Sequence, residues 1–262
     1  MPIDRIKALR TQRQEVLDYC RDLSAADWET DSRAAGWRVK DVVAHFAGEC
    51  KVMFSPKIIG VIATSDTEAK NEDLLESWRD MPADKVLAEF EKWSARAASL
   101  LRVTTGGPLG AIPLPLGNLG RYPIRLLPSV FVFDWYTHLK HDIAPALDRP
   151  APPIDEERMA VTLEWMLAGL GQMNRESMTW LNRPIGLTLT GPAGGNWQIT
   201  PLRKGKLEVE PGKGAKPIAR ITGRSTDFPL WATTREKWRD HDLTIEGDKD
   251  VAEKFLDAVN II

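Results

Sequence analysis

Apolar residues recur at helical spacing through the first half of the chain. Between residues 3 and 23 they fall every three or four positions among charged residues, which predicts a long amphipathic helix. The same criterion predicts a second helix that begins near Val39 and ends or kinks at Pro56, because proline cannot continue a helix. It also predicts a third helix over residues 83–101 and a fourth that starts at about Pro128, a residue typical of the first helical turn. The first half is therefore predicted to be helical.

Two stretches between these helices have the composition of connections. Residues 63–71 are mostly polar, and residues 104–122 are rich in glycine and proline with apolar residues interleaved. A structureless connection as long as the second is usually a functional lid or a flexible excursion. The composition leaves both readings open.

The pattern changes in the second half of the chain. A proline-rich stretch over residues 144–153 reads as a stiffened linker, and residues 155–174 have the pattern of another helix. Alternation of apolar and polar residues then predicts strands, and two helices are expected among them. The predicted strands cover 185–190, 197–200, 206–210, 218–222 and 243–246, and the predicted helices 226–233 and 248–260. We therefore expect two domains, residues 1–150 and 151–262, the second α+β with a mainly antiparallel sheet.

Composition narrows the classes of function. The 262 residues carry 35 basic and 37 acidic side chains, a net charge of -2, which gives no electrostatic support for binding nucleic acid or an anionic membrane. No apolar run approaches the length of a membrane span, and the charged N-terminal segment lacks the apolar core of a secretory signal. The two cysteines are too few for a disulfide framework and fit a reducing cytoplasm.

Candidate chemistry gathers in residues 133–142, which hold two of the four histidines. Asp134 and His138 are one helical turn apart and share a face, and His45 and Glu49 have the same spacing in the second predicted helix. Imidazole and carboxylate both bind zinc-like ions, and three protein ligands would leave a position for water or substrate. We rank His45, Asp134 and His138 as ligands, with His141 as a substitute. Such spacing is also typical of solvated helix faces, so spacing alone leaves metal binding open.

Two motifs resemble a known family. Residues 37–45 read Trp-Arg-Val-Lys-Asp-Val-Val-Ala-His, which is similar to the Trp-x-Val-x-Asp-Val-Val-x-His segment of the mycothiol-dependent maleylpyruvate isomerase family, a branch of the DinB-like metal-binding bundles. Asp134 and His138 match that family's acidic-x-x-x-His pair. The stretch 223–248, with Trp231, Arg235 and Gly247-Asp248, resembles the sterol-carrier-like domain found behind that bundle. The resemblance covers nearly the whole chain.

The resemblance implies a DinB-like up-down four-helix bundle followed by a sterol-carrier-like α+β domain. It also implies a divalent metal on His45, Asp134 and His138, most often zinc, with nickel or manganese as alternatives. A low-molecular-weight thiol such as mycothiol would be the cosubstrate of a cytoplasmic monomer or homodimer. The implied reaction is isomerisation or S-transfer on a small acidic or electrophilic molecule.

The second domain is expected to supply a basic side chain for an acidic substrate. Guanidinium groups pair bidentately with carboxylates, so the candidates are Arg235 first, then Arg224 and Arg220. Each is also typical of an ordinary surface arginine.

Two departures from the family pattern affect the expected chemistry. The family has Glu where this chain has Asp134, and its His-x-x-Asp continuation here contains one extra residue, as His138-Leu-Lys-His141-Asp142. His141 is therefore expected to hold a ligand or a substrate group from outside the metal's own ligands. A metal-assisted hydrolase and a small-molecule or lipid-binding protein with a vestigial metal site remain alternative functions.

The remaining conspicuous residues are interpreted as structural ones. The ten tryptophans are spread along the chain as in core packing, and His241 is expected to be an exposed turn residue before a strand. Cys20 and Cys50 are read as small buried side chains, although Cys50, next to Glu49, leaves a redox or ligand role open.

Overall fold

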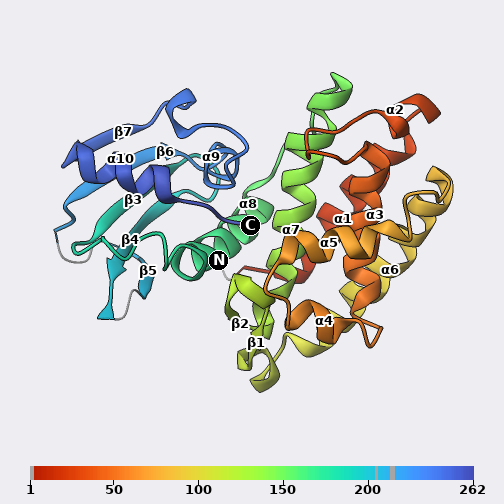
Figure 1. Ribbon diagram of the computed structural model, residues 1–262, viewed down its shortest axis with the longest axis horizontal. Coiled ribbons are helices and arrows are strands. Elements are labelled where there is room, and N and C mark those ends of the chain that lie inside the picture. Colours follow the sequence, from red (N-terminus) through yellow and green to blue (C-terminus); the bar gives the residue numbers. More distant parts are fainter. Residues whose placement is uncertain (1–2, 204–205, 213–215) are drawn as a thin grey trace. The chain divides into compact units, whose positions relative to one another are not determined.

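The computed structural model describes residues 3–203, 206–212 and 216–262. Contacts between Cα atoms divide the chain into two compact units, residues 1–154 and 155–262 (Figure 1). The first unit is helical and the second contains a five-stranded sheet. This confirms the predicted two-part α+β architecture.

The first unit is built on four long helices that pack as a bundle. Helix α3 packs against α6, and α1 packs against both α6 and α7. Their apolar faces form a core that includes Leu9, Leu17, Phe46, Phe90 and Trp135. The helices of this unit are α1 (Arg5–Arg21), α2 (Ala25–Glu29), α3 (Val39–Val52), α4 (Ile58–Ile62), α5 (Thr67–Glu76), α6 (Ala83–Thr104) and α7 (Leu127–Thr137). The four predicted helices correspond to α1, α3, α6 and α7.

Side-chain caps fix where several of these helices begin. The Asp4 carboxylate accepts a hydrogen bond from the Lys7 amide at 3.0 Å at the start of α1, and Ser24 and Asp27 form a reciprocal capping box at the start of α2. At the start of α3, the Asp41 carboxylate accepts from the backbone amide of Arg38 at 2.9 Å. This last cap fixes the first turn of the helix that carries His45.

Two predicted connections contain regular structure. Residues 63–71 were predicted to be a polar connection, but α5 begins at Thr67, where the Asp66 carboxylate caps the Ala69 amide at 3.0 Å. The sequence of α5 is mostly polar because Leu75 is its one buried residue, and a polar stretch of this kind is easily taken for a connection. Residues 104–122 contain strand β1 (Pro113–Pro115), which pairs antiparallel with β2 (Arg121–Pro123). Gly117 and Gly120, with φ of 55° and 122°, allow the chain to reverse there. A lid role for this hairpin stays a prediction.

The second unit begins with α8 (Glu156–Met173) and continues into a sheet of order β5-β4-β3-β6-β7. The strands are β3 (Ile185–Thr190), β4 (Gly195–Pro201), β5 (Leu207–Pro211), β6 (Ala219–Arg224) and β7 (Thr244–Gly247). Neighbouring strands run antiparallel except for the central pair β3 and β6, which is parallel. Apart from small shifts at the ends, these are the predicted strands, and the prediction of a mainly antiparallel sheet is confirmed.

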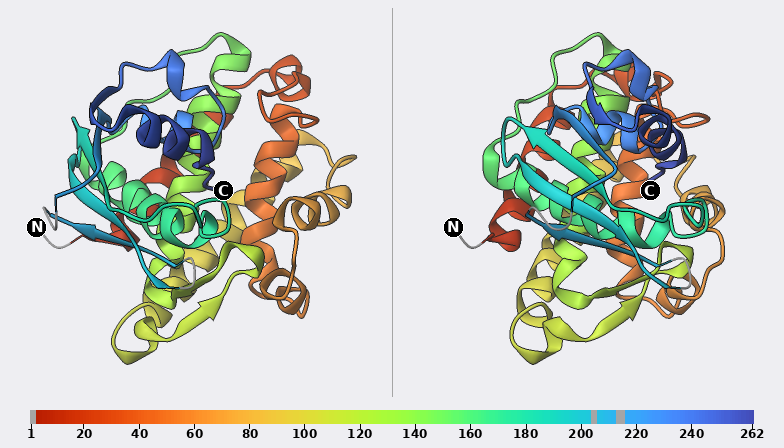
Figure 2. Two further views of the ribbon diagram at one scale, coloured as in Figure 1. Left: turned by 60° about the vertical axis from the view of Figure 1, so that its left-hand side comes forward. Right: turned by 90° about the vertical axis from the view of Figure 1, so that its left-hand side faces the viewer.

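Two further helices complete the second unit. Helix α9 (Phe228–Ala232) follows β6, and α10 (Lys249–Ala258) follows β7 and packs against both of these strands (Figure 2). The core of this unit includes Ile185, Ile199, Ile221, Phe228 and Phe255. That this unit is sterol-carrier-like is what the sequence resemblance implies.

Across the described ranges, every helix is too short or too polar to cross a lipid bilayer.

Candidate metal centre

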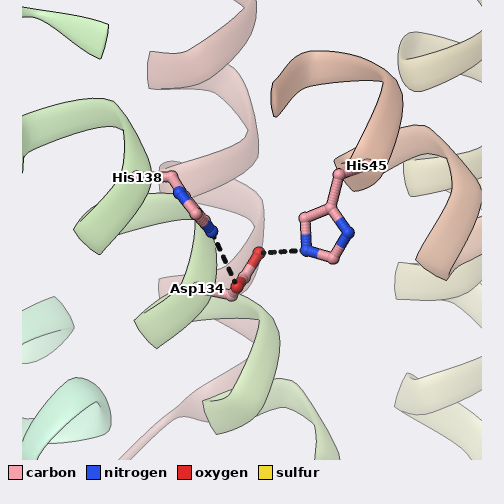
Figure 3. A group of neighbouring side chains, drawn as sticks. All are labelled: His45, Asp134 and His138. Carbon is pink, nitrogen blue, oxygen red and sulfur yellow. Dashed lines mark ion pairs between the residues drawn. The ribbon is translucent and has the colours of Figure 1, made fainter. Parts of the chain in front are cut away.

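Three side chains from two bundle helices meet inside the first unit (Figure 3). His45 comes from α3, Asp134 from α7, and His138 from the residue that directly follows α7. The Nε2 atom of His45 lies 3.5 Å from Asp134 Oδ2, and the Nε2 atom of His138 lies 3.6 Å from Asp134 Oδ1. Sequence reasoning selected these three residues, and the fold brings them together.

The spacing of these atoms fits a small metal ion. Each residue offers one ligand atom, and these atoms lie within 4.8 Å of one another. Zinc binds nitrogen and oxygen ligands at about 2.0–2.2 Å, so tetrahedral ligands of one ion are roughly 3.3–3.6 Å apart. The two imidazole-to-carboxylate distances fall within that range but end on different oxygens of Asp134, and the full set of ligand atoms spreads over up to 4.8 Å. Two imidazoles and one carboxylate also match three-ligand catalytic zinc sites, which keep a fourth position for water or substrate.

His138 is held by a carboxylate that the sequence analysis did not select. Its Nδ1 atom lies 2.6 Å from Asp142 Oδ2, and the Asp142 side chain is almost fully buried. The contact has ion-pair distance but not hydrogen-bond geometry, since Nδ1 has no hydrogen-bond partner among the described residues, and it places a negative charge beside the ring on the side away from Asp134. His138 therefore presents its other ring nitrogen, Nε2, to Asp134.

A local change of helix type produces this pairing. Residues His138–Ile143 form a π-helix, in which the Ala144 amide donates to the Leu139 carbonyl five residues earlier at 3.0 Å. Such wide turns are rare and often lie at functional sites. The extra residue that separates this chain from the His-x-x-Asp pattern is accommodated here. In the sequence, only this one-residue insertion could have pointed to a special role for Asp142.

His141 lies in the same turn but is not part of the three-residue group. Its side chain is buried, and its ring centroid lies 5.7 Å from that of Tyr136 in an edge-to-face arrangement. Asp142, and not His141, is the neighbour within contact distance of the His138 Nδ1 atom. A role for His141 in holding a substrate group stays a prediction.

Glu49 places a second carboxyl group near Asp134. Burial raises the pKa of Glu49 well above its usual range, and the nearby Asp134 carboxylate raises this pKa further. Trp135 Nε1 donates a hydrogen bond to Glu49 Oε1 at 2.5 Å, which opposes these effects in part. Glu49 therefore holds its proton to higher pH than an ordinary carboxyl group does, and Asp134 is the carboxylate that faces the two histidines.

Aromatic rings enclose the two histidines. Phe46, which is fully buried, has its ring centroid 6.1 Å from that of His45 and 5.8 Å from that of His138. Trp37, which is partly exposed, lies 5.1 Å from the His45 ring and 6.1 Å from the His138 ring. The sequence analysis treated Trp37 as ordinary packing and missed this contact.

Both cysteines are buried and free. Burial raises the pKa of Cys20 to about 12 and raises that of Cys50 well above its usual value, so neither thiol is readily ionised. Among the described residues, the group with metal-ligand spacing contains no cysteine. The reading of both cysteines as buried packing residues is confirmed.

The candidate arginines all lie in the second unit. Arg224 is exposed at the end of β6, and Arg235 is exposed in the turn after α9. Arg220 is half-buried on β6, where its Nη1 atom donates to the Thr188 hydroxyl at 3.4 Å. Their role toward an acidic substrate stays a prediction.

His241 differs from its expected exposure. Its side chain is only 7% exposed and lies between Glu236 and Asp227, at 3.2 Å and 3.8 Å. The prediction of an exposed turn residue is therefore wrong, because two acidic neighbours enclose the ring.

Comparison with known proteins supports the resemblance. Residues 9–107 match the model of the mycothiol maleylpyruvate isomerase N-terminal domain. The crystal structure of the mycothiol-dependent maleylpyruvate isomerase aligns over 92% of this chain and 91% of that chain, with 14% identity and a TM-score of 0.58. A histidine-to-alanine variant of that enzyme aligns over the same shares, with 15% identity and a TM-score of 0.57. The first unit is therefore similar in sequence to a domain of a thiol-dependent isomerase, and the fold likeness covers most of the chain.

A shorter alignment involves sterol carrier protein 2 like 2 from Aedes aegypti. It covers 39% of this chain and 98% of that chain, with 19% identity and a TM-score of 0.32. A search of curated protein sequences found no match.

Proposed function

We propose that this protein is a divalent-metal-dependent enzyme that uses a low-molecular-weight thiol either to isomerise a small acidic or electrophilic molecule or to modify it by attachment of the thiol through its sulfur. The observation that carries the proposal is the arrangement of His45, Asp134 and His138, which places two imidazoles beside one carboxylate with ligand atoms within 4.8 Å of one another. The match of residues 9–107 to a mycothiol maleylpyruvate isomerase domain supports the choice of a thiol.

The three side chains have distinct tasks in this proposal. A divalent metal bound there would favour the thiolate form of a bound thiol, which is the reactive nucleophile. His45 and His138 provide neutral nitrogen ligands, while Asp134 provides one negative charge. Asp142 places a negative charge beside the His138 ring, and Phe46 and Trp37 supply apolar neighbours to both rings.

The reaction itself follows from thiol chemistry. A thiolate adds to the activated double bond of the substrate, rotation occurs about the resulting single bond, and elimination returns both the thiol and the isomerised alkene. The raised pKa of Glu49 favours its neutral form beside Asp134, which limits the negative charge near an incoming thiolate.

Zinc is the metal we propose, because a set of two imidazoles and one carboxylate suits it. Nickel and manganese are alternatives for the same ligands. The short stem of Asp134 distinguishes this site from the Glu of the family pattern. A cytoplasmic location agrees with the two free cysteines, since disulfides are rare in a reducing compartment.

Arg235 is proposed to bind the carboxylate of the substrate, with Arg224 as the alternative. Guanidinium binds a carboxylate through two parallel hydrogen bonds, which lysine cannot reproduce. Arg235→Lys is therefore expected to raise KM by about tenfold with little change in kcat, whereas Arg224→Lys leaves both constants unchanged. The reverse pattern would assign the role to Arg224.

The direct test is isomerisation of maleylpyruvate by zinc-loaded protein, followed by absorbance with a panel of thiols that includes mycothiol. We expect turnover that requires both metal and thiol, and that is lost in His138→Ala. Turnover of an ester without any thiol would instead indicate metal-assisted hydrolysis. Absence of metal, together with a retained apolar ligand, would indicate a binding protein.

A further inference from the structure

Trp37 lies against both histidines and is held by hydrogen bonds of its backbone and of its side chain. It directly precedes the N-cap residue of α3, and its side chain lies along the helix toward His45. The indole plane is inclined by only 20° to the His138 ring and by 49° to the His45 ring. The indole therefore covers both imidazoles from one side.

The backbone of Trp37 is fixed by the loop that precedes α3. Its carbonyl accepts hydrogen bonds from the Ser32 amide and the Ser32 hydroxyl, both at 2.8 Å, and its amide donates to the Ala34 carbonyl at 3.0 Å. Gly36, with φ of 80°, adopts a conformation that side chains disfavour and so closes this loop. Both backbone polar groups of Trp37 are thus hydrogen-bonded independently of its side chain.

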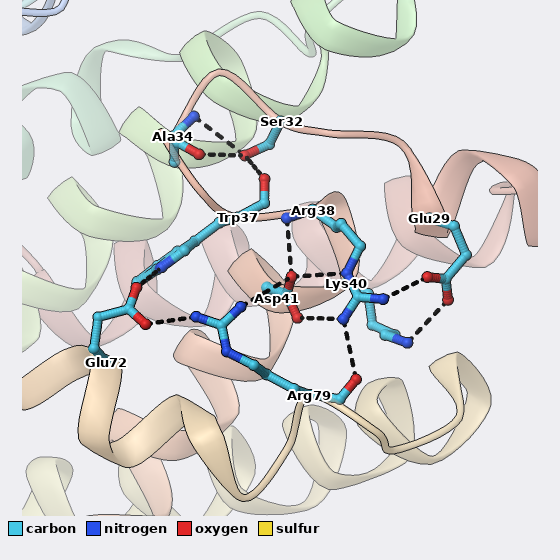
Figure 4. A network of polar contacts seen from close by, with 9 residues as sticks. All are labelled: Glu29, Ser32, Ala34, Trp37, Arg38, Lys40, Asp41, Glu72 and Arg79. Carbon is cyan, nitrogen blue, oxygen red and sulfur yellow. Dashed lines mark hydrogen bonds and ion pairs between the residues drawn. The ribbon is translucent and has the colours of Figure 1, made fainter.

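The side chain is fixed from helix α5. Trp37 Nε1 donates a hydrogen bond to the Glu72 carboxylate, and Arg79 Nη2 donates to the other oxygen of that carboxylate at 2.5 Å (Figure 4). Arg79 also joins the capping network of α3, since its carbonyl accepts from Arg38 Nη2 at 3.0 Å. Arg38 is bound in turn by Asp41, which is 1% exposed. The ring is therefore tied to the helix that carries His45.

We propose that Trp37 is a positioning and specificity-determining residue of the metal centre. Its indole face forms an apolar wall beside His45 and His138, and Glu72 fixes that wall in place. This inference rests on the proposed function. Of the two aromatic residues that flank both imidazoles, Phe46 is fully buried, and Trp37 is partly exposed. A small ligand that reaches the centre consequently packs its apolar part against Trp37.

The ligand class follows from this wall. Burial of one methylene group against an apolar surface improves affinity by about fourfold. The centre should therefore prefer a thiol with apolar atoms next to sulfur over a thiol of similar size with a hydroxyl group there. Propanethiol and 2-mercaptoethanol form such a pair.

The experiment uses protein loaded with cobalt(II), whose absorption spectrum reports both ligand geometry and thiol binding. Trp37→Ala removes the wall, Trp37→Phe keeps an aromatic face without the N–H group, and Glu72→Leu releases the ring. Trp93→Ala is the matched control, because Trp93 is also partly exposed and donates its Nε1–H to a helical glutamate, Glu89, at 2.8 Å. Circular dichroism checks the folding of each variant.

Wild-type protein should bind propanethiol about four- to tenfold more tightly than 2-mercaptoethanol. All variants should retain cobalt. The preference should approach one in Trp37→Ala, be intermediate in Glu72→Leu and in Trp37→Phe, which both lose the hydrogen bond between Trp37 and Glu72, and persist in Trp93→Ala. Cobalt binding with an unchanged preference in folded Trp37→Ala and Glu72→Leu would overturn this inference alone. Failure of the wild type to bind cobalt would overturn the proposed function together with the inference that rests on it.

Discussion

Two histidine–carboxylate groups, one in each unit, show what distinguishes a candidate metal site from an ordinary ion pair. In the first unit, two imidazoles face one carboxylate, at 3.5 Å and 3.6 Å. In the second unit, one imidazole, that of His241, lies between two carboxylates, at 3.2 Å from Glu236 and 3.8 Å from Asp227. Both histidine environments are largely buried, so burial does not separate them.

The difference lies in which atoms are available for a cation. Each nitrogen of the His241 ring lies beside a different carboxylate, Nδ1 beside Asp227 and Nε2 beside Glu236, so the ring separates the two acidic groups. In the first unit, Asp142 lies beside Nδ1 of His138, and Nε2 is directed at Asp134. Among the described residues, only this first group has ligand atoms that converge. The convergence of ligand atoms therefore identifies the metal site better than the number of acidic neighbours does.

The largest expected effect is the loss of a ligand. His138→Ala should weaken zinc affinity by more than about 100-fold, above the range known for groups outside the ligand set. His241→Ala should leave zinc affinity unchanged. Competition with a chromophoric chelator measures both constants. An equal loss of zinc affinity in the two variants would show that the two histidine–carboxylate groups do not differ in metal binding.

A smaller loss is expected when the support of His138 is removed. Asp142→Ala should weaken zinc affinity by about 10–100-fold, because the His138 ring loses the negative charge beside it. Asp142→Asn should retain part of the affinity, since the amide keeps a polar side chain of similar size beside Nδ1. The same chelator assay applies. If neither substitution changes the zinc affinity, the contact between Asp142 and His138 does not affect metal binding.

The metal-free protein should show a pH dependence that originates at Glu49. Its pKa is raised in the folded state by burial and by Asp134, so the folded state holds the proton more tightly than the unfolded state. This contribution to stability is full below the ordinary carboxyl pKa and is lost as pH rises toward the raised value. Glu49→Gln should therefore stabilise the metal-free protein at pH 8 by about 1–3 kcal/mol.

Thermal unfolding at pH 5 and pH 8, with chelator present, measures this effect. The gain from Glu49→Gln should be larger at pH 8 than at pH 5. A gain that does not depend on pH would show that ionisation of Glu49 is not its cause. Zinc should narrow the difference in the wild type, because a cation offsets the negative charge of both carboxylates.

The smallest effect is expected at the ion pair of the second unit. Glu236 is 42% exposed, and exposed ion pairs contribute about 0–1 kcal/mol. Glu236→Gln should therefore lower the free energy of unfolding by less than about 1 kcal/mol and leave metal content unchanged. Denaturant unfolding measures the first quantity. A loss of metal would show that the His241 group binds metal after all.

Sequence reasoning reached the three candidate ligands because their determinants are local. Asp134 and His138 are one helical turn apart, and the apolar neighbours of His45 point its face toward the bundle core. The strands of the second unit were predictable for the same reason, since the alternation of apolar and polar residues can be seen in neighbouring positions of the sequence. The parallel pairing of β3 with β6 depends on strand order and was not predictable from that alternation.

The missed residues depend on non-local geometry. Asp142 reaches His138 through a π-helical turn, which a regular helical template does not contain. Trp37 precedes its helix, and its ring is fixed by Glu72, a residue of the α5 helix whose start was read as a connection. His241 was misjudged because its neighbours Glu236 and Asp227 enclose it only after the chain folds.

The central claim is that His45, Asp134 and His138 hold one divalent metal ion. The most direct test is metal content by mass spectrometry on protein without an affinity tag, with His45→Ala and His138→Ala as variants of equal helical content by circular dichroism. The account predicts about one ion per wild-type chain and almost none in either variant. Wild-type protein that stays metal-free after reconstitution with zinc, nickel and manganese would contradict it.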